Sequence, residues 1–493
     1  MYLLSTTLRT VVFGAALLTL STCARNPVSG KREISLMSTE QEIAIGKESH
    51  PSIVASMGLY ENAALQAFMT EKGQAMAKIS HRPDLPYQFY IVDTPVVNAF
   101  AVPGGYVYFT RGILAHFNNE AEFAGVLGHE IGHITAKHAS RQQTKQLFGT
   151  LGTIAASIYN PQLGQAVQQG AGMLLLKYSR DHESEADQIG VGYSSKIGYD
   201  AREMANFFQT IKRIQDNSGQ AVPNMLSTHP DPGNRYTRVN QLAQEYQTQT
   251  PGNFAINRNQ YLKLVNGLVF GEDPKQGFVE NDMFYHPELK FQFPVPNGWQ
   301  YQNSPAQFQM GPKDGKSAMI LMPAPGNTLD EAAQALVKQL NLTVLENARV
   351  TIDGNPALMI VSQQKPEQQQ QGQQQQQAQQ QTTANTLQIG TYLIQHNGAI
   401  YALHGLASAA SFANAFPTFK SVAERFRTLT DPDKLNRKPD RVYVKTVPRS
   451  GTFREAMTAL GMPASRMEEL GVLNSLKADE RVVQGDLIKV IGK

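Results

Sequence analysis

The segment GVLGHEIGHITAKH, residues 125–138, carries two histidines four positions apart, with a glutamate directly after the first. On a helix, positions i and i+4 lie on one face, so His129 and His133 could direct their imidazole nitrogens at one metal ion. Glu130 would point about 100° away, near enough to accept a proton from a water on that metal. An ordinary helix is the alternative, because a zinc enzyme needs a third protein ligand and the chain has 11 histidines.

A second segment, YSRDHESEADQIG at residues 178–190, offers that third ligand. Glu183 and Asp187 stand four apart and would share a helical face, whereas Glu185 would point roughly the opposite way. One acid could bind the metal, and the other could accept the spare N–H of a ligating histidine. His182 is a rival ligand, about 100° from the Glu183 face. A solvated acidic helix face is the alternative interpretation.

Three ordered motifs, HEIGH, SRDHESEAD and STHPDPGNR, are similar to those of the HtpX- and BepA-like family of zinc metalloendopeptidases, gluzincins with HExxH followed by ExxxD. The segments NPVSGKREISLMSTEQEIAIG and NAFAVPGGYVYFTRGIL resemble the exported periplasmic branch, so the resemblance covers roughly residues 26–250. It implies one Zn²⁺ per chain. The implied ligands are His129, His133 and Glu183, with Glu130 as the general base and Asp187 supporting a ligand.

The resemblance also places a histidine matching His229 near the metal, where it would stabilise the oxyanion or occupy the open metal position as a latch. Arg235 matches a family arginine beside it. From the residues alone, a turn histidine before Pro230 is the alternative. The family's edge strand, which pairs with an extended substrate backbone, matches Asn98, Ala99, Phe100 and Ala101. His116 and His138 match no motif position and are predicted to be structural.

The N-terminus predicts export. An apolar run from Val11 to Leu20 is too short to span a bilayer comfortably but suits a signal peptide. It leads into LSTC, which resembles a lipobox, so we expect residues 1–23 to be a signal peptide and Cys23, the only cysteine, to be lipidated. A simple secretory signal with an incidental cysteine is the alternative. We therefore expect a periplasmic protein of a bacterial cell envelope, anchored by lipid to the outer membrane.

The composition fits an α+β multidomain protein. The 493 residues are 41% hydrophobic and 17% charged, enough for several packed cores. A net charge of +3 without a basic block gives no support to nucleic-acid binding. The predicted domains are a mainly helical zincin-type metallopeptidase domain with a small β-sheet (24–250), an α+β accessory domain with a disordered glutamine-rich insert at 363–383 (251–430), and a small LysM-like βααβ module (440–493).

Local patterns place elements around the motifs. Aromatic and β-branched runs in YQFYIVDTPVVNAFAVPGGYVYFTRGIL, broken by PGG, predict strand, turn and strand. Asn119 and Glu122 form a capping pair at the start of the HEIGH helix. Ser38 or Thr39 is expected to cap an earlier helix, with Glu42 as the reciprocal partner of Thr39.

These patterns lead to one main hypothesis, a zinc-dependent endopeptidase that hydrolyses peptide bonds of misfolded or misassembled envelope proteins. The alternative is a low-activity, metal-bound scaffold or chaperone that docks envelope proteins or peptidoglycan. Peptidoglycan contact is suggested by NSL at 474–476 and QGDL at 484–487, which resemble LysM segments; a generic protein-contact fold is the other possibility there. A glycan hydrolase has no paired-carboxylate pattern to support it.

Overall fold

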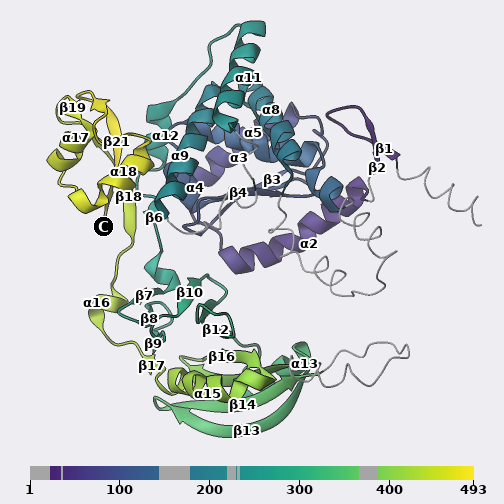
Figure 1. Cartoon of the computed structure of the whole chain (residues 1–493), viewed down its shortest axis with the longest axis vertical. Coiled ribbons are helices and arrows are strands. Elements are labelled where there is room, and N and C mark those ends of the chain that lie inside the picture. Colours follow the sequence, from purple (N-terminus) through teal and green to yellow (C-terminus); the bar gives the residue numbers. More distant parts are fainter. Residues whose placement is uncertain (1–22, 35–36, 144–177, 219–228, 230–233, 366–385) are drawn as a thin grey trace, which may run out of the picture. The chain divides into compact units, whose positions relative to one another are not determined.

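The computed structural model describes residues 23–34, 37–143, 178–218, 229, 234–365 and 386–493 (Figure 1). The chain divides into two compact units, one of Met1–Val54, Gly58–Gly271 and Asp440–Lys493, the other of Ala55–Met57 and Glu272–Pro439. Both units contain helices and sheets, so the predicted mixed, multidomain fold class is confirmed. The expected signal peptide, apart from Cys23, and most of the glutamine-rich insert lie outside the described residues.

A three-stranded sheet in the first unit contains the predicted strand, turn and strand. Its order is β3-β5-β4, with β3 (Gln88–Val92) parallel and β4 (Ala99–Val102) antiparallel to β5 (Tyr106–Thr110). Gly104 has a φ of 85°, which glycine adopts without steric cost. A Cβ there would also lie 2.6 Å from the backbone oxygen of Glu42. Among the described residues, β4 pairs with β5 alone and forms one edge of the sheet.

Helices pack around this sheet (Figure 1). They are α2 (Thr39–Met57), α3 (Ala63–Lys78), α4 (Arg111–His116), α5 (Glu120–Thr135), α8 (Arg180–Lys196), α9 (Arg202–Ser218) and α11 (Arg235–Gln249). The helix α5 carries HEIGH and is buried along its whole length, as expected for a helix inside a core. The predicted cap of α5 is present, because the side chain of Asn119 accepts a hydrogen bond from the backbone N–H of Glu122 at 2.8 Å. No helix in the described part of the chain is both long and apolar enough to cross a membrane.

The cap of α2 differs from one expectation. Ser38 is the capping residue and Gln41 its reciprocal partner, so the predicted pairing of Thr39 with Glu42 is wrong. Glu42 is instead 1% exposed and forms an ion pair with Arg82. Tertiary contact with Arg82 thus gives this glutamate a role that its spacing could not reveal.

Glycines allow α5 and α8 to approach closely. A Cβ on Gly128 of α5 would lie 2.9 Å from the backbone oxygen of Gly190 in α8, and a Cβ on Gly190 would lie 3.0 Å from the backbone nitrogen of His129. Larger residues would therefore push the helices apart. The close packing brings the histidines of α5 within reach of the acids of α8.

The C-terminal residues belong to the same unit. β18 (Asp440–Thr446) lies between β21 (Leu487–Gly492) and β6 (Val269–Phe270), and the short α17 (Phe453–Ala459) and α18 (Met467–Asn474) lie between β18 and β21 in sequence. Lys489 is fully buried, and its ammonium donates hydrogen bonds to the carbonyl oxygens of Ala115 and Phe117, both at 2.8 Å. These carbonyls directly precede α5, so the C-terminal segment contacts the start of the HEIGH helix. The remaining short elements of this unit are β1 (Cys23–Arg25), β2 (Arg32–Ile34), α12 (Arg258–Leu264), β19 (Gly451–Thr452), η3 (Ala464–Arg466) and β20 (Arg481–Val482).

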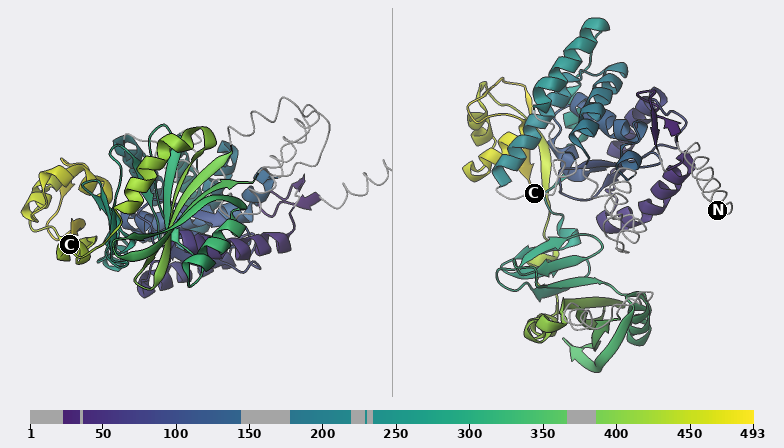
Figure 2. Two further views of the ribbon diagram at one scale, coloured as in Figure 1. Left: turned by 90° about the horizontal axis from the view of Figure 1, so that it is seen from below. Right: turned by 45° about the vertical axis from the view of Figure 1, so that its right-hand side comes forward.

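The second unit is built on a seven-stranded antiparallel sheet of order β10-β11-β12-β16-β15-β14-β13. The helix α15 (Ala409–Glu424) lies across one face, as Figure 2 shows, and α13 (Leu329–Gln339) covers the other. The alternation along β15 explains this, because Tyr392 and Ile394 face the core under α15 whereas Leu393 faces the one under α13. The strands of this sheet are β10 (Gln300–Asn303), β11 (Phe308–Gly311), β12 (Ser317–Pro323), β13 (Leu342–Ile352), β14 (Asn355–Gln364), β15 (Leu387–His396) and β16 (Ala399–Ser408).

A smaller sheet of the second unit comprises β7 (Phe278–Glu280), β8 (Met283–His286), β9 (Phe291–Pro294) and β17 (Arg427–Thr428). The remaining elements of this unit are η2 (Pro274–Gln276) and α16 (Pro432–Leu435).

Candidate metal centre

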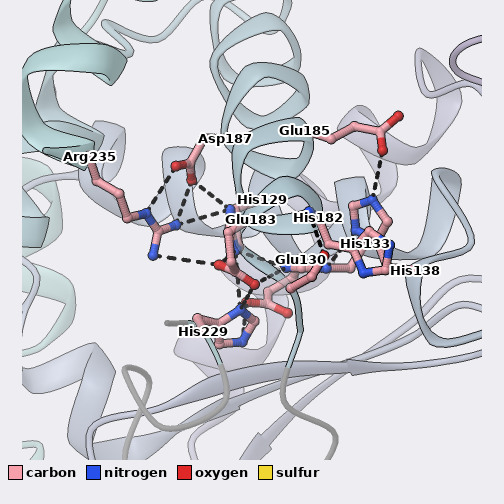
Figure 3. A network of polar contacts seen from close by, with 11 residues as sticks. His129, Glu130, His133, His138, His182, Glu183, Glu185, Asp187, His229 and Arg235 are labelled. Atoms are coloured by element: carbon pink, nitrogen blue, oxygen red, sulfur yellow. Dashed lines mark hydrogen bonds and ion pairs between the residues drawn. The ribbon is translucent and has the colours of Figure 1, made fainter. Parts of the chain in front are cut away.

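Four side chains converge in the interior of the first unit (Figure 3). His129 and His133 come from α5, Glu183 comes from α8, and His229 comes from the segment before α11. One donor atom from each lies within 4.8 Å of the other three. All four residues are at most 2% exposed. The structure therefore brings together the three predicted ligands and the predicted neighbouring histidine.

The distances between the donor atoms fit a tetrahedral metal ion. The Nε2 atoms of His129 and His133 are 3.0 Å apart, and they lie 3.4 Å and 3.5 Å from oxygens of Glu183. The Nδ1 atom of His229 is 3.3 Å from Nε2 of His129 and 3.2 Å from Oε1 of Glu183. Four ligand atoms about 2.0–2.1 Å from a tetrahedral metal are about 3.3–3.4 Å from one another. The donor set thus has the size and the chemistry of a metal site.

Electrostatics also favour a cation at this place. Burial alone would lower the pKa of His129, but hydrogen bonds to Asp187 and Glu183 raise that pKa to about 9. Burial would raise the pKa of Glu183, yet His229 and His129 hold it well below its usual value. Burial lowers the pKa of His133 far below the ordinary histidine value. Without a metal ion, the cluster therefore holds a proton on His129 while His133 is neutral. A metal ion would replace the proton on Nε2 of His129, because Nδ1 donates to Asp187.

An ion pair supports His129 from the side away from the cluster. Nδ1 of His129 donates to Oδ1 of Asp187 at 2.9 Å. Arg235 donates to both oxygens of Asp187, at 2.5 Å and 2.9 Å, and its guanidinium lies 3.9 Å from the ring centroid of Phe208. Nη1 of Arg235 is also 3.6 Å from Glu183. The two predicted supporting residues, Asp187 and Arg235, thus fix both the tautomer and the orientation of His129.

Glu130 lies beside the cluster with its carboxylate oxygens free. It is fully buried, and neither oxygen accepts a hydrogen bond from a described residue. Nε2 of His229 lies 3.7 Å from Oε1 of this carboxylate. Burial raises the pKa of Glu130. A buried carboxylate without a hydrogen bond is costly, and such groups concentrate at functional sites.

The remaining candidate residues lie around this centre. His182 stacks on His138 with a centroid distance of 4.4 Å and does not belong to the donor group. His116 donates a hydrogen bond from Nδ1 to the backbone oxygen of Gly112 at 2.8 Å, within its own helix. The predicted substrate-pairing residues lie at the edge strand, Asn98 just before β4 and Ala99, Phe100 and Ala101 within it.

His138 is the residue that the sequence motifs missed. Its Nδ1 is 2.8 Å from Nδ1 of the ligand His133, and its Nε2 is 3.1 Å from Glu185. His138 follows the end of α5, so helical periodicity could not place it. Its only sequence signal is its position five residues after His133, which matches no ligand spacing on a helix.

Comparison with known proteins now decides the family. Residues 63–243 match the family model described as peptidase family M48. The M48 match contains every residue of the metal centre, and the family that the motifs indicated is confirmed. Membership of a metalloprotease family agrees with a donor group that fits a metal ion.

Two curated proteins are similar to part of this chain. The beta-barrel assembly-enhancing protease of Yersinia pestis is 31% identical over 231 residues, which cover 44% of this chain and 47% of that protein. The mitochondrial metalloendopeptidase OMA1 of Arabidopsis thaliana is 34% identical over 167 residues, which cover 34% of this chain and 33% of that protein. The chain thus spans less than half the length of either relative.

A solved structure has a weak likeness to part of this chain. The solution structure of cyanobacterial PsbP (CyanoP) from Synechocystis covers 30% of this chain and 91% of its own, with 12% identity and a TM-score of 0.23. That likeness is too weak to support an argument.

Proposed function

We propose that the chain is a zinc-dependent endopeptidase. The observation that carries this proposal is the carboxylate of Glu130, which accepts no hydrogen bond from a described residue and lies beside the His–His–Glu–His donor group. Three nitrogen atoms and a carboxylate oxygen are ligands that Zn²⁺ prefers. The names of the two relatives, a protease and a metalloendopeptidase, support the same reaction.

The proposed ligands of the zinc ion are His129, His133 and Glu183. A zinc ion bound there would supply Lewis-acid chemistry, polarising a peptide carbonyl and lowering the pKa of a water toward ~7. Asp187 holds the imidazole of His129 through its Nδ1–H, which keeps Nε2 free to bind. The close contact of α5 and α8 keeps the three ligands together.

Glu130 is the proposed general base. One of its carboxylate oxygens accepts the proton of the attacking water and later donates it to the departing amine nitrogen. Its raised pKa suits this task, because a base whose pKa lies nearer neutrality also returns the proton readily. Its freedom from other hydrogen bonds leaves both oxygens available for the water.

The edge strand β4 is the proposed docking site for the substrate backbone. β4 pairs only with β5 among the described residues, so its outer backbone groups can pair with an extended peptide. Asn98, Ala99, Phe100 and Ala101 would make these contacts. An extended substrate presents each peptide bond to the site in the same orientation, which suits cleavage inside a chain.

His229 is the proposed latch of the site. Its Nδ1 atom lies 3.3 Å from Nε2 of His129 and 3.2 Å from Oε1 of Glu183. It could therefore hold the fourth position of a bound zinc ion, which a catalytic site keeps open for water and substrate. A substrate must therefore displace this imidazole before Glu130 can act. The alternative role for His229 is stabilisation of the oxyanion. That role needs its imidazole near the metal ion but not bound at the fourth ligand position.

We place this activity in the bacterial cell envelope, with misfolded or misassembled envelope proteins as substrates. The name of the Yersinia pestis relative supports this setting, as does the lipobox-like sequence, which would lipidate Cys23 and anchor a periplasmic protein to the outer membrane. A LysM-like contact with peptidoglycan is a weaker extension. Of the two LysM-like segments, 484–486 is exposed, whereas Ser475 is hydrogen-bonded to Asn118 and Thr210.

Hydrolysis of casein by the zinc-loaded protein tests the proposal. Wild type should cleave casein, a chelator should stop it, and Glu130→Gln should reduce the rate by about 10²–10⁴-fold while still binding zinc. If wild type and Glu130→Gln are equally inert but both bind unfolded envelope proteins, the low-activity scaffold is the better description. The His229→Ala protein belongs in the same assay, because a closed latch would make wild type slow.

A further inference from the structure

A second chain of polar contacts reaches the metal centre from the side opposite to Asp187. Figure 3 shows His138 and Glu185 beside His133, away from Asp187 and Arg235. The Nδ1 atoms of His133 and His138 are 2.8 Å apart, and Nε2 of His138 is 3.1 Å from Oε2 of Glu185. Nη1 of Arg141 donates to the same oxygen at 2.7 Å. The contacts thus run unbroken from a metal ligand to an arginine.

The direction of these hydrogen bonds follows from their chemistry. The carboxylate of Glu185, paired with Arg141, only accepts hydrogen bonds, so Nε2 of His138 carries the proton between them. A neutral His138 then has a lone pair at Nδ1 and accepts from Nδ1–H of His133. His133 is left with its lone pair on Nε2, the atom that faces the metal position. The opposite direction would protonate Nε2 of His133 and remove it as a ligand.

We propose that His138 is a positioning residue for the metal ligand His133, with Glu185 and Arg141 holding it in turn. This inference rests on the proposed metal site and adds residues to it that no motif assigns. The two histidine ligands then have matching supports of different chemistry. His129 is held by a carboxylate backed by Arg235, and His133 is held by a neutral imidazole backed by a carboxylate and an arginine.

The rings around this contact are fixed in place. His138 is fully buried and stacks on His182 at 4.4 Å, with an angle of 14° between the ring planes. The ring of His133 stacks on Tyr178 at 4.1 Å and 19°. With each ring stacked on a flat neighbour, the hydrogen bond between the two histidines sets the rotation of the ligand ring.

The backbone between the two histidines is shaped for this contact. Lys137 has a φ of 56°, a left-handed conformation that is uncommon for residues other than glycine and asparagine. This reversal ends α5 and returns the chain over its last turn, so that His138 meets His133 from outside the helix. A residue that is not glycine in this conformation costs of the order of 1 kcal/mol, and the contacts of His138 offset that cost.

The chain of contacts continues to the N-terminal hairpin of β1 and β2. Nε of Arg141 lies 3.3 Å from Oε2 of Glu33, which accepts a hydrogen bond from the side chain of Asn26 at 3.1 Å. Asn26 also donates to the carbonyl oxygen of Ala136 at 3.4 Å. Glu33 thus holds the outer end of this series of contacts, four contacts away from His133, and Asn26 in turn holds Glu33.

Zinc affinity of the full-length protein tests the proposal without relying on activity. The affinity is measured by competition with a chromophoric chelator, and the visible absorption of the Co²⁺-substituted protein reports ligand geometry. His138→Leu should lower zinc affinity about 10–100-fold and change the Co²⁺ spectrum. His138→Asn places an amide oxygen near the position of Nδ1, so it should restore most of the affinity. His116→Asn is the matched control for replacing a half-buried histidine away from the metal, and it should bind zinc as wild type does.

The outcomes separate the inference from the proposed function. If His138→Leu melts like wild type without metal but binds zinc within threefold of it, His138 does not position the ligand. If His138→Leu fails to fold, the test depends on His138→Asn. A zinc affinity of His138→Asn as low as that of a ligand variant, such as His133→Ala, would also contradict the inference. Wild-type protein that binds no zinc overturns the metal site itself, and with it both proposals.

Discussion

Replacement of His229 by alanine distinguishes a latch from an oxyanion-binding residue by the sign of its effect. The imidazole is 1% exposed, and its Nδ1 lies 3.2–3.3 Å from Glu183 and His129. These distances would let it act as a fourth donor to a metal ion bound there, as the proposed latch requires. Removal of a fourth donor opens the position that water and substrate need, so we expect His229→Ala to raise the rate of peptide hydrolysis.

The size of the gain follows from the contacts that hold the latch closed. A hydrogen bond or ligand contact to a charged group contributes a net of about 1.5–3 kcal/mol. A closed state favoured by that amount leaves about one molecule in ten to one in a hundred and fifty open. Removal of the latch should therefore increase kcat/KM by about 10–100-fold. Zinc affinity should fall at the same time, because one of the four donors is lost.

Cleavage of a fluorogenic peptide and zinc competition are measured on the same preparations. The double variant with Glu130→Gln must be inert, which assigns any gained activity to this site. Loss of an oxyanion donor would instead reduce kcat by about 10²–10³-fold and leave zinc affinity unchanged. A lower rate with wild-type zinc affinity would therefore refute the latch and favour the oxyanion role.

Three further substitutions test the surroundings of the site and the second unit. Gly128→Ala should destabilise the first unit by about 1–3 kcal/mol and weaken zinc binding, because its Cβ would lie 2.9 Å from a carbonyl oxygen of α8. Gly192→Ala in α8 is the control, since a Cβ there meets no atom within 4 Å. It should change neither the melting temperature in thermal melts nor the affinity in zinc titrations. Arg235→Leu should lower the free energy of unfolding of the metal-free protein by about 3–5 kcal/mol, because it leaves the buried carboxylate of Asp187 without its cation; denaturant unfolding with an unchanged midpoint would contradict this. Burial lowers the pKa of His404 to about 4, below the value near 6.5 of an unfolded chain, so its neutral form contributes stability above pH 6.5 that is lost as the pH falls through 4. Wild type should therefore lose folding stability between pH 7 and pH 4, and His404→Asn should lose less of it, by up to about 3 kcal/mol. The shift of the melting transition of the second unit with pH measures this difference.

Local sequence patterns predicted the structural elements that depend only on residues close together in the sequence. The cap at Asn119, the strand–turn–strand before α4 and the shared helical face of His129 and His133 all follow from backbone geometry over a few residues. The same reasoning failed for Glu42, whose spacing suggested a helix cap. A buried ion pair with Arg82, distant in sequence, holds that carboxylate instead.

The sequence by itself determined the chemistry of the centre: two imidazoles and a following carboxylate on one helix, and two acids on a second helix. Their spacing is fixed by the helical repeat, which every sequence of this pattern shares. Tertiary structure decided which atoms meet. The glycine contact between α5 and α8 brings Glu183 to the histidines, and the tertiary fold places His229 within 4.8 Å of the same donor atoms. The left-handed backbone of Lys137, which its residue type does not favour, turns His138 onto His133. Such contacts depend on the packing of segments far apart in the chain, and no local pattern encodes them.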